Sequence, residues 1–236
     1  MQAALSGGVS SRDVARFNAL ASRWWDPAGP MLALHRMNPV RIGWIDRRMA
    51  PASRVLDVGC GGGLAAEALA RRGHDVLGVD VAGEAIAVAR AHASALGLAL
   101  GYREATVDEL LAEGVRFQVI TALEVIEHVP DPAAFLGVLA GLLEAEGALF
   151  LSTLNRTPRS FLAAKMGAEY LLRWLPVGTH DWRRFITPGE MGRLVRGAGL
   201  RVADITGLVF DPFTLSWSAG RDLGVNYLLE ARAAGR

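Results

Sequence analysis

The sequence is poor in cysteine, in long apolar runs and in net charge. With Cys60 as its one cysteine, the chain can form neither a disulfide framework nor a cysteine metal site, which suits a reducing compartment. No uncharged apolar stretch approaches the roughly 18 residues of a membrane span, and no signal peptide opens the chain, so we expect a cytoplasmic protein. The net charge of +1 argues against a nucleic-acid partner.

Strand-like and helix-like patterns alternate along the chain. Strands are expected at 54–59, 75–80, 98–106, 117–124, 147–154, 200–210 and 226–233, and helices at 62–71, 83–96, 132–143 and 188–198. Repeated βαβ units predict a single α/β domain over 1–236, Rossmann-like, with a seven-stranded, mostly parallel sheet and helices on both faces. Residues 1–50 are predominantly helical and are expected to cap the pocket.

Two of the expected strands end on an acid. The first ends near Asp57 and runs into four glycines within 59–63, a turn that lets the backbone approach a ligand closely. The second ends on Asp80, which follows Asp57 by 23 residues. That is about the spacing at which a nucleotide-binding unit places an acid on a ribose. The pair of acids favours a cofactor site over a simple tight turn.

Details of the turn point to the type of cofactor. A dinucleotide fingerprint has glycine at its sixth position, where this chain has Leu64. Asp57 would repel a diphosphate but would suit the ammonium group of a methionine moiety. The pattern therefore resembles the first motif of the class I S-adenosylmethionine-dependent methyltransferases, which implies that Asp57, Gly59, Gly61 and Asp80 hold this cofactor.

A cluster of polar residues follows the strand at 117–124. Glu124, Glu127 and His128 could converge on a divalent cation such as Mg²⁺ if the segment makes a helical turn. In the alternative interpretation, Glu124 contacts the cofactor, Glu127 is solvated and His128 caps the turn. His128 is also the best candidate for a base that deprotonates a phenol.

Several specific stretches carry a resemblance over residues 17–227. They include Trp24-Trp25-Asp26, His35-Arg36-Met37-Asn38-Pro39, Glu127-His128-Val129-Pro130-Asp131-Pro132, Ser152-Thr153-Leu154-Asn155-Arg156 and Gly178-Thr179-His180-Asp181. Together with the glycine turn, they resemble the bacterial ubiquinone-biosynthesis O-methyltransferases, which have the class I methyltransferase fold. Where this family usually has an aspartate near its C-terminus, the chain has Gly224.

The resemblance implies an activity and a set of site residues. The activity is S-adenosylmethionine-dependent O-methylation of polyprenylated phenols, namely 2-polyprenyl-6-hydroxyphenol and 3-demethylubiquinol. Another small phenolic or lipid acceptor is the alternative. Cofactor contacts fall on Arg41, Gly59, Asp80 and Leu123, and the divalent-metal positions on Glu124, Glu127 and His128. Membership of a quinone-biosynthesis complex is a further expectation.

An insertion at 156–186 separates the fifth expected strand from the helix at 188–198. It combines aromatic residues with a net charge of +4 over 156–184, because six cations outnumber two acids there. A lid over the pocket with solvated arginines is one interpretation. We expect a lid that also contacts an anionic membrane surface, placing the protein peripherally on the inner face of the membrane.

Overall fold

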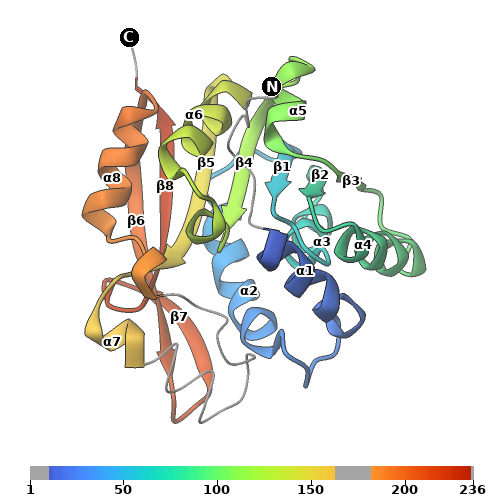
Figure 1. Ribbon diagram of the computed structural model, residues 1–236, viewed down its shortest axis with the longest axis horizontal. Coiled ribbons are helices and arrows are strands. Elements are labelled where there is room, and N and C mark those ends of the chain that lie inside the picture. The colour runs from blue at the N-terminus through green and yellow to red at the C-terminus, as the bar shows by residue number, and fades with distance from the viewer. Residues whose placement is uncertain (1–10, 163–181, 235–236) are drawn as a thin grey trace.

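The computed structural model describes residues 11–162 and 182–234, which form one sheet flanked by helices (Figure 1). The sheet has eight strands in the order β3-β2-β1-β4-β5-β8-β6-β7. In chain order they are β1 Arg54–Val58, β2 Asp75–Asp80, β3 Gly101–Glu104, β4 Phe117–Leu123, β5 Leu143–Leu154, β6 Leu200–Asp211, β7 Ser216–Gly220 and β8 Asn226–Ala233. Strands β1 to β5 are parallel neighbours, whereas β8, β6 and β7 pair antiparallel.

The expected strand count of seven was one too low. The additional strand is β7, which forms a hairpin with β6 through the turn at 212–215. Asp211 stabilises this turn, because its Oδ1 accepts hydrogen bonds from the backbone N–H groups of Phe213 and Thr214. The turn contains no glycine, and Leu215 takes the left-handed backbone conformation that glycine would normally supply.

The expected helices are confirmed, with ends that shift by one or two residues. The longer helices are α1 Ser11–Leu20, α2 Leu32–Asp46, α3 Leu64–Ala70, α4 Gly83–Ala95, α5 Val107–Ala112, α6 Pro132–Leu142 and α8 Pro188–Gly197. Short ones are η1 Ala21–Arg23, η2 Ile126–His128, α7 Pro158–Phe161 and η4 Trp182–Arg184. Helix α5 was not expected; Thr106 starts it with a capping box to Glu109.

Successive side chains of the strands point to opposite faces of the sheet and pack in two separate hydrophobic cores. Leu56 and Ile120 face a core that includes Phe135 and Leu139 of α6. On the opposite face of the sheet, Val55 packs in a second core built with α2, α3 and α4. The parallel strands are therefore covered on both sides, and ligand access is left to their ends.

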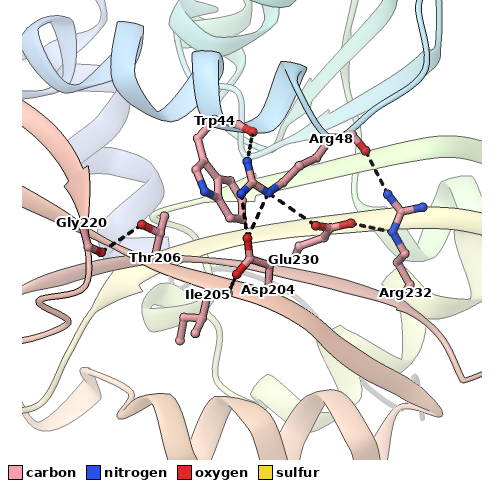
Figure 2. Close-up of polar contacts among 8 residues, drawn as sticks. All are labelled: Trp44, Arg48, Asp204, Ile205, Thr206, Gly220, Glu230 and Arg232. Carbon is pink, nitrogen blue, oxygen red and sulfur yellow. Dashed lines mark hydrogen bonds and ion pairs between the residues drawn. The ribbon is translucent and has the colours of Figure 1, made fainter.

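Arg48, just beyond α2, connects that helix to the antiparallel half of the sheet (Figure 2). Its guanidinium donates to Asp204 Oδ2 at 2.7 Å and to the carbonyl of Trp44 at 3.0 Å, and lies 3.7 Å from Glu230 Oε2. Arg232 completes the network with bonds to Glu230 and to the Arg48 carbonyl. These contacts fix the C-terminal end of α2 against β6 and β8.

Both predicted peripheral segments are only partly covered by the description. Of residues 1–50, the structure describes 11–50, which contain the helices α1, η1 and α2. Of the insertion at 156–186, residues 163–181 lie outside the described residues. In the parts of the chain that are described, no helix has the length and apolar character needed to span a bilayer.

Candidate active site

The turn between β1 and α3 is shaped by its glycines. Gly59, Gly61 and Gly63 have φ angles of 65°, 52° and 94°, in the region that L side chains rarely adopt. A Cβ at Gly59 would lie 2.5 Å from Val125, and one at Gly61 would lie 2.1 Å from the Trp24 ring. The turn is therefore confined on one side by Val125, which follows β4, and on the other by Trp24, which follows η1.

Asp80 holds this turn from the end of β2. Its Oδ2 accepts the N–H of Gly61 at 2.8 Å, and its Oδ1 accepts the N–H of Ala82 at 2.9 Å. Burial raises the pKa of Asp80, while these backbone bonds act in the opposite direction. Each carboxylate oxygen of Asp80 has a second lone pair that could accept a hydrogen bond from a ligand hydroxyl.

Asp57 is buried near the end of β1, and one of its carboxylate oxygens accepts a hydrogen bond. Its Oδ1 accepts the hydroxyl of Thr121, its register partner on β4, at 2.6 Å. Its Oδ2 is buried and makes no hydrogen bond of normal geometry with the described residues, although the backbone N–H of Ala66 on α3 is near enough to lower the pKa of the carboxyl group. Burial raises the pKa of Asp57 to about 6, although the Thr121 bond and the Arg41 charge lower it. An acid in this state is suited to a cationic ligand group.

Arg41 reaches the same region from α2. It is 3 % exposed; its Nε donates to Asn38 Oδ1 at 3.1 Å, and Asn38 in turn donates to the Leu64 carbonyl at 2.8 Å. Burial lowers the pKa of Arg41, and the nearby charges of Glu124 and Asp57 raise it. Its Nη1 is buried without a partner among the described residues. This donor could bind a carboxylate.

Glu124 and Glu127 lie close together after β4. Glu124 has a φ of 58°, stabilised by a bond from its N–H to the Ser152 carbonyl at 3.0 Å, and its Oε1 accepts the Ser152 hydroxyl at 2.8 Å. Glu127 is 4 % exposed and accepts the Thr153 hydroxyl at 2.9 Å. Burial and the adjacent Glu124 raise the pKa of Glu127 well above its usual range.

His128 lies against α1. Its Nδ1 lies 3.8 Å from Asp13 Oδ2, and its ring meets the edge of Phe17 with centroids 5.6 Å apart. Within residues 11–162 and 182–234, no group of three His, Cys, Asp or Glu residues is arranged to hold a metal ion. The structure thus brings Glu124 and Glu127 together but does not add His128 to them.

Four polar residues near the site were not assigned to it from the sequence: Asn38, Thr121, Ser152 and Thr153. Asn38, Ser152 and Thr153 lie in stretches that carry the family resemblance, whereas Thr121 lies outside them. Thr121, Ser152 and Thr153 are fully buried in β4 and β5, among otherwise apolar residues. Polar side chains inside a buried strand are the signal that could have identified them, because such groups need a partner. Leu123, an expected cofactor contact, is the buried last residue of β4.

Comparison with known proteins gives the same fold and a family. A methyltransferase domain model matches residues 33–205. Among solved structures, a magnesium protoporphyrin IX methyltransferase from Synechocystis with bound SAH has a TM-score of 0.70 at 19 % identity, covering 95 % of this chain and 99 % of that one. A SAM-dependent methyltransferase from Aquifex aeolicus has a TM-score of 0.62 at 14 % identity, covering 94 % and 99 %. At these identities the likeness concerns the fold.

The sequence relatives are much closer. The ubiquinone biosynthesis O-methyltransferase of Marinobacter nauticus is 46 % identical over 95 % of this chain and 96 % of its own length. The enzyme of the same name from Cereibacter sphaeroides is 47 % identical over 93 % and 95 %. With relatives this similar over nearly its whole length, the chain belongs to the ubiquinone biosynthesis O-methyltransferase family and is a methyltransferase of the class I fold.

Proposed function

We propose that this enzyme uses S-adenosylmethionine to methylate phenolic hydroxyls of polyprenylated ubiquinone precursors. The observation that carries the proposal is a pair of buried atoms beside the glycine turn, Asp57 Oδ2 and Arg41 Nη1, that have no hydrogen-bond partner within 11–162 and 182–234. One is a carboxylate oxygen and the other a guanidinium nitrogen, which are the partners that the ammonium and carboxylate of a methionine moiety require. The names of the sequence relatives support the pathway.

The residues present suit this cofactor. Asp57 and Arg41 would hold its amino-acid end, Asp80 its ribose hydroxyls, and Gly59 and Gly61 would let it approach the backbone. Bound S-adenosylmethionine would supply a methyl group already activated by its sulfonium. The enzyme must therefore align the acceptor oxygen and assist loss of its proton.

His128 is our candidate for the base that takes this proton. A free phenol has a pKa of about 10, so deprotonation at neutral pH needs assistance. The Nδ1 of His128 lies 3.8 Å from Asp13 Oδ2, and a proton on Nδ1 would make Nε2 the nitrogen that accepts the phenol proton. Helix α1 covers the ring through Phe17 and would limit water around the acceptor.

The divalent cation expected from Glu124, Glu127 and His128 does not fit these side chains as they stand. The two carboxylates are adjacent, but the histidine faces α1. We therefore derive no step through a cation. Methyl transfer measured with Mg²⁺ and then with EDTA addresses this expectation: retained activity in EDTA leaves catalysis to His128, and strict dependence on Mg²⁺ restores the three-residue metal set.

We further propose that the substrate is taken from an anionic membrane surface through residues 156–184. Phe161 and Leu162 of the described part are 38 % and 58 % exposed, and Phe213 at the tip of the β6–β7 hairpin is 96 % exposed. Figure 1 shows α7 and this hairpin at the same end of the molecule, beyond the carboxyl ends of the parallel strands. Peripheral location on the inner membrane face and membership of a quinone-biosynthesis complex belong to the same proposal.

The direct test is methyl transfer from labelled S-adenosylmethionine to short-tailed 3-demethylubiquinol and 2-polyprenyl-6-hydroxyphenol. Labelled product with either acceptor supports the function. Cofactor binding without product would move the assignment to another phenolic or lipid acceptor, which is the second candidate. Vesicle flotation with and without anionic lipid tests the membrane contact, and absence of binding in both cases rejects it.

A further inference from the structure

Trp25 lies between the glycine turn and α4. Its indole N–H donates to the carbonyl of Gly62 at 2.9 Å. Its ring stacks on the imidazole of His92 with centroids 3.5 Å apart and an interplanar angle of 8°. Residue 25 is thus bonded to the turn at one edge and packed against α4 over its face, although it is 37 residues before Gly62 in the sequence.

The orientation of His92 is in turn fixed by a buried acid, Glu67. Its Nδ1 lies 2.8 Å from Oε1 of Glu67, whose side chain is fully buried on α3, directly after the turn. The other oxygen of Glu67 accepts from Arg71 at 2.8 Å. Since the carboxylate accepts at Nδ1, the imidazole carries its proton there and its plane is set by Glu67. The buried carboxylate of Glu67 would destabilise the fold if it were unpaired. An apolar side chain at residue 67 would pack without that cost.

The neighbouring residue closes the cap over the turn. The Trp24 ring lies so near Gly61 and Gly62 that a Cβ on either would come within 2.1 Å and 2.3 Å of it. The Trp24 carbonyl is 2.9 Å from Nε2 of His35, whose ring meets the edge of the Trp25 ring. The cap therefore contacts the turn that we assign to the cofactor, and Trp25 connects that contact to His92 and Glu67.

We propose that Trp25, His92 and Glu67 form a latch that holds the N-terminal cap on the glycine turn and sets how fast cofactor and product exchange. This inference rests on the proposed function, because it assigns the turn to S-adenosylmethionine. The three residues are positioning residues: they act through the cap and the turn and touch no reacting atom. Each turnover requires S-adenosylhomocysteine to leave, and in this proposal the latch opens for its release.

The test is the dissociation rate of S-adenosylhomocysteine, measured by stopped-flow displacement without any acceptor. Trp25→Phe keeps a ring on His92 but loses the bond to Gly62, and His92→Ala loses the stack. We expect each to raise the dissociation rate about five- to tenfold, the size of one lost hydrogen bond or aromatic pair. The double variant should exceed the larger single effect only slightly, since both changes break the same latch.

Two matched controls separate this role from general stability. Trp44→Phe alters a buried tryptophan of α2. His74→Ala breaks another histidine–carboxylate pair in which one partner is buried, with Nε2 2.9 Å from Asp46. Both should leave the dissociation rate unchanged. His92→Phe, which retains a stacking ring, should recover part of the wild-type rate and serves if His92→Ala does not fold. Equal rates in latch variants and controls would overturn the latch, whereas failure of the wild type to bind S-adenosylhomocysteine would overturn the cofactor assignment and the latch with it.

Discussion

Thr121 and Asp57 are register partners on neighbouring parallel strands, and the Thr121 hydroxyl donates to one carboxylate oxygen at 2.6 Å. This bond fixes the rotation of the carboxyl group, and the part of the chain that the structure describes offers Oδ2 no hydrogen-bond partner. A threonine inside a buried strand thereby orients the acid toward the edge where ligands of such sheets bind. The arrangement favours ligand binding at the expense of the stability of the empty protein.

Asp57→Asn should stabilise the empty enzyme and weaken cofactor binding. The pKa of Asp57 is raised to about 6 in the fold. The folded state therefore binds this proton more tightly than the unfolded chain, whose Asp pKa is about 3.9, and stability falls as pH rises between these values, by up to about 3 kcal/mol. Urea unfolding should show that the substitution raises the free energy of unfolding more at pH 7.5 than at pH 5. Calorimetry should show at least about tenfold weaker binding of S-adenosylmethionine.

An equal gain at both pH values would show that Asp57 does not titrate in this range. Thr121→Val is the matched variant, because it removes the hydroxyl while retaining the shape of the side chain. It should leave both carboxylate oxygens without a partner and shift the pH dependence of stability to higher pH.

Asp80→Ala and His128→Ala should affect different kinetic constants. Asp80 holds the Gly61 N–H and faces the proposed ribose position, so its loss should raise KM for S-adenosylmethionine at least about tenfold with a smaller change in kcat. Loss of His128 as base should lower kcat by about 10² to 10⁴ and leave cofactor affinity intact. Steady-state kinetics with both substrates varied separates the effect of each substitution on KM from its effect on kcat. If both variants changed only the melting temperature, the site assignment would be wrong.

Glu124→Gly should be more stable than Glu124→Ala. Both variants lose the carboxylate, but the backbone at this residue has a φ of 58°, which costs an alanine more than a glycine. The expected difference is about 1 kcal/mol in the free energy of unfolding, measured in urea. A more stable alanine variant would mean that the left-handed conformation is not kept.

Arg48→Ala should destabilise the fold by about 2–4 kcal/mol. The variant removes the central guanidinium of the network in Figure 2 and leaves Asp204 and the buried Glu230 with fewer partners. Arg103→Ala is the control, because it breaks an ion pair with Glu113 in which both side chains are largely exposed. That control should change thermal stability little. Similar losses in the two variants would argue against α2 being anchored through Arg48.

Much of the fold is predictable because its strands are short apolar runs that end on acids or glycines. The hairpin strand β7 was missed because its turn has Leu215, not glycine, at the left-handed position. At the site, Asp57 and Asp80 could be placed from their positions at the ends of strands. The direction of His128 could not, since it depends on α1 packing against the short helix η2, a contact between segments more than 100 residues apart.

The most direct test of the account is a crystal structure of the enzyme with S-adenosylhomocysteine. We predict that the amino group of the ligand lies within hydrogen-bonding distance of Asp57 Oδ2. Its carboxylate should bind Arg41 Nη1, and its ribose hydroxyls should bind Asp80. The amino-acid end bound elsewhere, with Asp57 Oδ2 and Arg41 Nη1 still unpartnered, would contradict it.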